Sequence, residues 1–203
     1  MSDRILDPET EVLQALSQAI NEATSHTAFD TALTNALSQV CEVTGCDYGE
    51  AWIPSHDGTV LELSPLWYCR NPDSDSMPAF EQFRICSEKF ILPPNIGLPG
   101  RVWSSQQPEW IPDVSEHSEA YFLRNQIALA CGVKAGFGVP ILVNHQVIAV
   151  LVFFMSQVRQ EDKELIELVT AVASYLGEIL RSPTASEQAT ITKTGKFSKG
   201  EKR

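Results

Sequence analysis

Cysteine is the residue type in this chain with the widest range of chemistry, because a thiolate can bind a metal, form a disulfide or act as a nucleophile. The chain has five cysteines, at Cys41, Cys46, Cys69, Cys86 and Cys131. Their number is odd, their spacing is irregular, and neither a CxxC pair nor a histidine cluster accompanies them. This pattern argues against a zinc site and against a disulfide framework. We expect reduced thiols packed as small apolar groups, and no metal site.

The other residues that could support catalysis are scattered. None of the four histidines, His26, His56, His117 and His145, has a partner at ligand spacing, and we expect solvated or capping side chains. Asp162 and Glu164 begin a predicted helix, where carboxylates complement the helix dipole. The sequence contains neither a nucleophile–base constellation nor a phosphate-binding P-loop. It therefore predicts a protein that is not an enzyme.

The net charge of −11 is unevenly distributed. Residues 182–203 hold five basic side chains against two acidic ones, which is +3, so residues 1–181 carry −14. An acidic body repels phosphate backbones and anionic membrane surfaces, and no pattern of basic and aromatic residues interrupts it. We expect neither nucleic acid nor a membrane as a partner.

Length and hydropathy favour one soluble domain. A chain of 203 residues, 43% of them hydrophobic, can bury a sizeable core. The longest apolar run, Val147 to Met155, has nine residues, whereas a membrane-spanning helix requires about 18. The first residues lack the basic and then apolar order of a secretory signal. We expect a cytoplasmic protein.

Two amphipathic helices are predicted before the first strand. Asp7-Pro8-Glu9 is a helix start, and apolar residues follow at three-and-four spacing as far as Ala23. A second helix is expected from residue 25 or 27 to just before Gly45. Strands over residues 48–53 and 59–69 then flank His56-Asp57-Gly58. Because glycine tolerates a positive φ, this Asp-Gly pair predicts an antiparallel hairpin.

The middle of the chain is predicted to alternate short helices and one short strand. A helix is expected through Phe80, Phe83 and Phe90, ending at Pro93-Pro94-Asn95. The expected elements after it are a helix over 99–105 that follows a glycine bend, a strand over 109–111 and a helix over 118–130.

The last part of the chain is predicted to form strands over 135–143 and 146–155 and a helix over 160–181. In the second strand Val147, Ala149, Leu151 and Phe153 alternate with Ile148, Val150, Val152 and Phe154. A strand that is apolar on both faces must be covered on both, which indicates an α+β fold with a central antiparallel sheet. Residues 182–203 hold too few large apolar groups to offset the entropy of ordering, and we expect them to be disordered.

Three stretches together resemble the second half of a GAF domain, the small-molecule sensor module of bacterial signalling proteins. They are Gly97-Leu98-Pro99-Gly100-Arg101-Val102-Trp103, Trp110-Ile111-Pro112-Asp113-Val114 and Gly136-Phe137-Gly138-Val139-Pro140-Ile141. The resemblance implies a sheet of about five or six strands, with the terminal helices on one face and a roof of loops and helices on the other. It divides the chain into an N-terminal helix in residues 1–26, a GAF-like domain in 27–181 and a basic tail in 182–203.

The resemblance also implies a ligand pocket beneath that roof. Carried onto this chain, its walls are Phe90, Trp103, Trp110, Phe122, Cys131 and Phe137. Arg101 and Arg124 would meet an anionic ligand, with Asp113 or Ser115 at the rim. Apolar walls supply affinity and a few polar groups orient the ligand. The alternative interpretation is that Arg101 braces a loop through Asp113 or a backbone carbonyl, and that the tryptophans only fill the core.

Three better-defined activities of the family match these residues less well. Bilin-binding members attach the chromophore to a cysteine at a position that falls near Leu123 here, so no covalent bilin is expected. Free methionine sulfoxide reductases have a catalytic cysteine at a place similar to Cys131, but their resolving thiol lies in the bend that reads Gly97-Leu98-Pro99-Gly100 here. Cyclic-nucleotide-binding members carry an Asn-Lys-Phe-Asp-Glu signature that this sequence lacks.

The resemblance therefore implies a non-enzymatic sensor that binds an unidentified small molecule. Terminal helices in the family often pair across a dimer and continue into an output domain. We expect a homodimer through Leu13, Leu16, Ile20 and the Leu168–Leu180 stripe, in a bacterial two-component system with an output kinase or regulator as partner. Two alternatives stay open, namely a ligand-free protein-interaction module and a cysteine-dependent reductase.

Overall fold

The computed structural model describes residues 10, 14, 28–70 and 77–181. The predicted N-terminal helix, its dimer-forming residues and the predicted disordered tail therefore lie outside the described residues, apart from Thr10 and Gln14, which are helical. In the described part of the chain, no helix combines the length and the apolar character that crossing a bilayer requires.

A six-stranded sheet forms the centre of the fold, with the strand order β3-β2-β1-β6-β5-β4 and antiparallel pairing throughout. The strands are β1 (Tyr48–Pro54), β2 (Leu61–Cys69), β3 (Ile91–Leu92), β4 (Glu109–Ile111), β5 (Gly136–Val143) and β6 (Gln146–Phe154). The predicted α+β fold with five or six antiparallel strands is confirmed. The strand β3 is absent from the prediction, because two residues are too few to show an alternating pattern.

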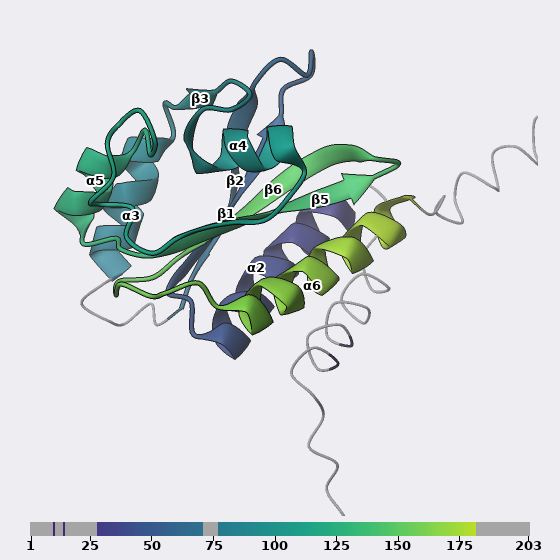
Figure 1. Ribbon diagram of the computed structural model, residues 1–203. Helices are drawn as coiled ribbons and strands as arrows, with labels where there is room; N and C mark the ends of the chain where they lie inside the picture. The colour runs from purple at the N-terminus through teal and green to yellow at the C-terminus, as the bar shows by residue number, and fades with distance from the viewer. Residues whose placement is uncertain (1–9, 11–13, 15–27, 71–76, 182–203) are drawn as a thin grey trace, which may run out of the picture.

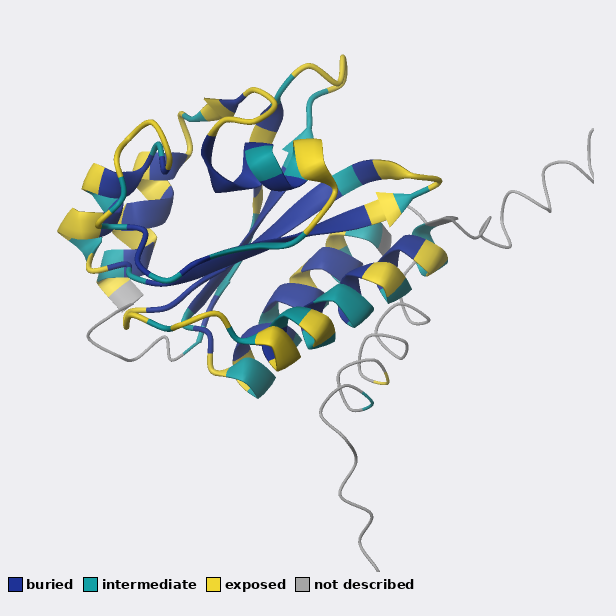
Figure 2. Ribbon diagram, in the orientation of Figure 1, coloured by how far each residue is buried: buried dark blue, intermediate teal, exposed yellow. Residues whose placement is uncertain are grey.

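Helices cover both faces of this sheet (Figure 1). Two long helices, α2 (Ala28–Thr44) and α6 (Lys163–Arg181), lie on one face. Three shorter helices lie on the other face and form the roof, namely α3 (Met77–Ser87), α4 (Gly97–Ser105) and α5 (Asn125–Cys131). Figure 2 shows the strands buried between these layers, while the helices expose their outer surfaces.

Two of the predicted roof helices are too long. The helix α3 ends at Ser87, so Phe90 follows it instead of belonging to it. The helix α5 begins at Asn125, whereas residues 118–124 form turns. The Asn125 side chain donates to the carbonyl of His117 at 2.7 Å, which ties the start of the helix to this turn region.

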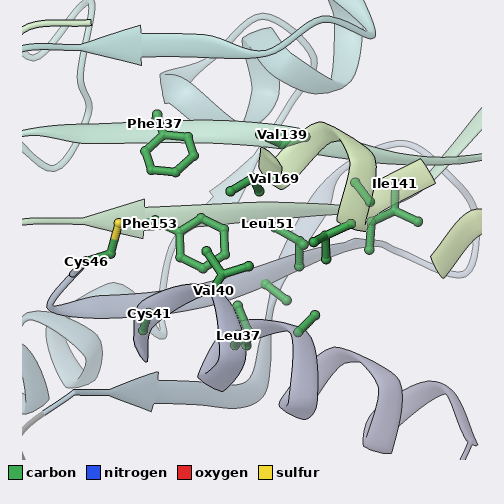
Figure 3. Close-up of a cluster of buried hydrophobic side chains, with 14 of the residues drawn as sticks. Leu37, Val40, Cys41, Cys46, Phe137, Val139, Ile141, Leu151, Phe153 and Val169 are labelled. Carbon is green, nitrogen blue, oxygen red and sulfur yellow. The ribbon is translucent and has the colours of Figure 1, made fainter. Parts of the chain in front are cut away.

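Two hydrophobic clusters divide the core. The helix-side cluster lies between the sheet and α2 and α6, where Leu151 and Phe153 of β6 meet Leu37 and Val40 of α2 (Figure 3). The roof-side cluster contains Val150, Val152 and Phe154 from the opposite face of β6. The prediction that β6 is apolar on both faces is therefore confirmed.

A β-bulge changes the alternation at the start of β6. Ile141 of β5 pairs with Ala149, but the next residue, Leu142, pairs with Val147, so Ile148 is the additional residue. As a result Val147 belongs to the roof-side cluster and Ile148 packs on the helix-side cluster. The faces predicted for these two residues are reversed, because hydrophobic alternation alone does not reveal a bulge.

Candidate functional site

A buried ion pair lies in the roof interior, by which we mean the space occupied by the roof-side cluster. Arg124 Nη2 is 2.7 Å from Glu50 Oε1, and Arg124 Nη1 is 3.3 Å from Glu50 Oε2. The two side chains are 2% and 0% exposed. Removing two charges from water is costly, and this cost is offset only when the pair is close and its remaining polar atoms have partners.

The sheet supplies Glu50 from its rigid centre. β1 lies between β2 and β6, and strand alternation directs Glu50, Tyr48 and Trp52 to the roof side. The Trp52 ring N–H donates to Glu50 Oε1 at 2.8 Å, and the Tyr48 hydroxyl donates to Oε2 at 3.2 Å. Burial, followed by the charge of Glu50, raises the pKa of Tyr48 well above its ordinary value, so its hydroxyl remains a donor.

The roof supplies Arg124 from a less regular segment. Arg124 immediately precedes α5 with non-helical φ and ψ of −100° and 19°, after the turns of residues 112–124. Its Nη1 also donates to the Ser87 hydroxyl at 2.9 Å, at the end of α3. The guanidinium therefore joins two roof elements to the central strand.

Aromatic rings surround this guanidinium. Its central carbon lies 4.7–5.6 Å from the centroids of four rings, those of Trp52, Phe83, Phe122 and Phe154. Cations at such distances are attracted by the electron-rich faces of the rings, by about 0.5–2 kcal/mol per contact. We call the four rings together with the Glu50 carboxylate the cage.

Several predicted pocket residues do border the roof interior. Phe122 is fully buried there, while Phe90, Trp103 and Cys131 are partly buried against the same cluster. Arg124 lies at its centre. The guanidinium that we predicted to meet an anionic ligand is bound by the protein's own carboxylate, Glu50.

Trp110 and Phe137 lie on the other side of the sheet, so their predicted place in the pocket wall is wrong. They are directly paired across β4 and β5, with ring centroids 4.9 Å apart, and Phe137 also stacks on Phe153 in the helix-side cluster (Figure 3). The roof side of β5 is occupied by glycine, since a Cβ at Gly138 would lie 3.1 Å from Val102 of α4. Alternation then forces Phe137 to the opposite face.

Arg101 and Asp113 are bound by protein groups at the periphery of the roof. Arg101 Nη2 is 2.6 Å from Glu109, its Nη1 donates to the carbonyl of Tyr121, and its guanidinium carbon is 4.0 Å from the Tyr121 ring centroid. Arg101 therefore braces a loop, as in the alternative interpretation, although its carboxylate partner is Glu109. Asp113 binds the backbone N–H and hydroxyl of Ser115, at 2.9 and 2.6 Å, and lies 3.4 Å from the Lys134 ammonium.

Sequence reasoning missed Glu50, the carboxylate at the centre of the site. The available signal was a charged residue inside an otherwise apolar strand, two positions from Tyr48 and from Trp52. Ser87 carries no such signal, because it ends a helix in the way many serines do.

Two surface clefts lie away from the cage. One of about 390 Å³ is lined by Gln107, Leu142 and Thr170, beside α6 and the end of β5. Another of about 260 Å³ is lined by Asp47, Arg70 and Arg159. Neither cleft has a cage residue in its wall. The cage itself holds the Arg124 guanidinium, which contacts its four rings and its carboxylate.

The thiols give little indication of catalysis. Cys131 is half-buried, and burial, followed by the charge of Cys86, raises the pKa of its thiol. A raised pKa keeps a thiol protonated and less nucleophilic. Across residues 28–70 and 77–181, histidine, cysteine and carboxylate side chains do not gather in threes as a metal site requires.

Comparison with known proteins places the whole described domain in one family. The model for the GAF domain matches residues 28–180. Protein NLP8 of Arabidopsis thaliana is 30% identical over 136 residues, which are 63% of this chain and 14% of NLP8. Protein NLP6 of the same plant is 28% identical over 127 residues, 58% of this chain and 15% of NLP6. This chain thus spans about one seventh of the length of these relatives, and its predicted bacterial origin remains a prediction.

Solved structures share the fold at low sequence identity. The GAF domain of an Acinetobacter phosphoenolpyruvate-protein phosphotransferase is 17% identical with a TM-score of 0.63, over 91% of this chain and 97% of that one. A free methionine-R-sulfoxide reductase from Neisseria meningitidis, solved with its substrate, is 17% identical with a TM-score of 0.65, over 93% and 98%. At these identities the similarity shows the fold alone.

Proposed function

This chain belongs to the GAF domain family, a general fold for small-molecule binding and signalling, and from that premise we propose that it is a non-enzymatic regulatory module. A small molecule enters the roof interior, separates Glu50 from Arg124 and changes how the roof is held on the sheet. The terminal helices then transmit this change to a second copy of the chain and to an output partner.

The observation that carries this proposal is the buried pair between Glu50 and Arg124. Apolar residues of similar volume would often give equal or greater stability at such a position, so stability alone does not explain two buried charges. Charged groups in unusual environments concentrate at functional sites. This pair also joins a segment of turns to a rigid strand, which are the two parts that must separate for the roof to open.

The opposite face of β1 offers a route from the roof interior to α2. Gly49 is the neighbour of Glu50 on the helix side, where an added Cβ would lie 3.2 Å from the Leu37 side chain of α2. Because β1 and α2 are in such close contact, a shift of β1 would displace this helix. A ligand moves such an equilibrium only by binding one arrangement better, and a change from 1:99 to 99:1 requires a difference of about 5.5 kcal/mol.

The dimerisation part of the proposal rests on α6. Leu168, Tyr175 and Ile179 are spaced along one side of this helix and remain only partly buried. Burying them against a second copy would remove further apolar surface from water. Sedimentation at high micromolar concentration tests this step, and a purely monomeric protein would exclude it.

A second candidate function is a ligand-free interaction module. The filled cage favours it, since Arg124 already provides the charge and the ring contacts that a ligand would make. The two candidates differ in one respect: only the regulatory module has a roof that opens. We propose neither a reductase nor another enzyme, because the Cys131 thiol has a raised pKa and the glycine bend has no thiol.

Native mass spectrometry of freshly purified full-length protein tests the regulatory function. We expect a co-purifying small molecule, and when that molecule is added back to protein freed of it, faster amide exchange in residues 112–131 and altered exchange in α6. Glu50→Gln is the control variant, and it should change how much of the molecule is retained, because it removes one member of the pair that the ligand separates. Absence of any bound molecule, with amide exchange that no metabolite mixture alters, would leave the ligand-free module as the function.

A further inference from the structure

We propose that the cage is a recognition site for an alkylguanidinium group and that Arg124 occupies it as a built-in competitor. This inference rests on the proposed function, because it names the ligand class of the same roof interior. It assigns the specificity to Glu50 and the four rings, and it makes Arg124 the part that a ligand displaces.

The contacts of Arg124 define what the cage recognises. Two nitrogens of one planar cation meet the two oxygens of Glu50, and Nη1 reaches the Ser87 hydroxyl as well. The rings of Trp52, Phe83, Phe122 and Phe154 lie around the same cation, with centroids 4.7–5.6 Å from its central carbon. A carboxylate fork within aromatic walls is the environment in which a guanidinium binds most favourably.

Other ligand classes satisfy these groups less well. An anion would approach the Glu50 carboxylate and leave it without its counter-charge, and a neutral molecule would leave both charges unpaired. An ammonium group is a compact point charge that does not reproduce the two parallel hydrogen bonds. Only an alkylguanidinium replaces every contact that Arg124 gives up.

Arg124 is placed so that it can leave. It stands at the junction between the turns of residues 112–124 and the short helix α5. The same turn region carries Glu116 and Glu119, both exposed, so a guanidinium released to solvent has acidic side chains on its own segment. Glu50, by contrast, is fixed between two neighbouring strands.

A tethered competitor has a calculable consequence for affinity. A group held on a short flexible segment acts at an effective concentration in the millimolar range. In the natural protein, the apparent association constant of an external alkylguanidinium is that of the empty cage multiplied by the fraction of time that Arg124 is away from the cage. Removing the Arg124 side chain therefore uncovers the affinity of the empty cage.

Arg124→Ala in the full-length chain tests the proposal, with N-propylguanidinium at low millimolar concentration as the probe. Calorimetric titration should give saturable binding, tighter than to the natural protein by about tenfold or more. N-propylurea, of the same shape and without charge, should not bind, and propylammonium should bind more weakly. The matched variant Arg124→Ala/Glu50→Gln should lose the binding by about tenfold or more.

Arg124→Lys provides a second variant in case the alanine variant does not fold. It keeps a cation beside Glu50 but forms a weaker contact, so N-propylguanidinium should displace it more readily than it displaces arginine. The natural protein provides a further measurement, in which the probe should accelerate amide exchange in residues 112–131. Equal binding of the guanidinium and the urea, or binding that Glu50→Gln leaves unchanged, would overturn the proposal.

The same measurements separate this inference from the proposed function. A co-purifying anionic or neutral ligand that opens the roof would support the regulatory function and refute the proposal that the cage binds an alkylguanidinium. The opposite result is that the probe binds to Arg124→Ala but does not alter amide exchange in α6 of the natural protein. This result would support the alkylguanidinium site and refute the regulatory function.

Discussion

Glu50 and Arg124 are 74 positions apart in the sequence, yet they form a two-point ion pair with almost no exposure to solvent. Glu50 belongs to the central strand and Arg124 to the roof. This contact therefore ties the roof to the centre of the sheet, and the proposed regulatory function and ligand class both depend on it.

Removing one member of this pair is expected to destabilise the fold strongly. Glu50→Gln or Arg124→Met leaves a buried charge without its partner, and the free energy of unfolding should fall by about 3–5 kcal/mol. The double variant should lose much less than the sum of the two. Urea unfolding at pH 7 measures all three.

The half-exposed pair of Arg159 and Asp162 is the control for that experiment. Its side chains are 38% and 31% exposed, so Arg159→Ala should cost about 1 kcal/mol or less. If the losses in the free energy of unfolding of the Glu50 and Arg124 single variants add fully in the double variant, the two residues are not coupled and our inference is wrong.

Gly177→Ala tests how tightly α6 packs on the sheet. In an open helix this change would stabilise the protein by about 1 kcal/mol. Here the added Cβ would lie 2.2 Å from the carbonyl oxygen of Leu142, a backbone atom at the end of β5. We therefore expect a net loss of about 1–3 kcal/mol. Ser174→Ala, at an exposed site on the same helix, should change the stability by about 0.5 kcal/mol at most; a more stable Gly177→Ala protein would refute the packing.

The start of α6 should be sensitive to acid through Asp162. Its carboxylate accepts the Leu165 backbone N–H at 3.1 Å and binds Arg159 at 2.6 Å, and the Leu165 bond is the largest influence that lowers the pKa of Asp162. A lowered folded-state pKa contributes stability above the unfolded value of about 3.9, and this stability is lost as the pH falls through the folded pKa.

Asp162→Ala should accordingly cost about 1 kcal/mol at pH 7, and its difference from the natural protein should shrink below about pH 4. Asp162→Asn keeps a capping oxygen and should cost less at pH 7. Urea unfolding between pH 7 and pH 3 measures both variants. A difference that does not change with pH would show that the charge of Asp162 contributes nothing.

The cysteines should react with a thiol reagent in the order of their exposure and pKa. Burial raises the pKa of Cys46 to about 11 and that of Cys41 well above its ordinary value, while Cys86 is exposed. At pH 8, Ellman's reagent should modify Cys86 first and reach Cys41 and Cys46 only after unfolding. Cys86→Ser should remove the fast phase. A fast reaction of Cys131 at pH 6 would instead favour the reductase alternative.

The sequence identified the layers of this protein and the family. Turn residues, helix starts and the apolar pattern of β6 are local signals, so the hairpin of β1 and β2, the strands β5 and β6 and the two long helices were predictable. The motifs around Gly97, Trp110 and Gly136 were also local. They indicated the family, and the GAF domain model that matches residues 28–180 confirms it.

The tertiary structure decided what occupies the site. Glu50 and Arg124 meet only because β1 is central and the roof folds back over it, and no local pattern encodes a contact over 74 positions. The side of the sheet that Phe137 faces depends on how β5 pairs with its neighbours, and the face of Ile148 depends on a bulge. Strand geometry fixes only that neighbouring side chains point to opposite faces of the sheet. It does not determine which of the two faces packs against the roof and which against the long helices.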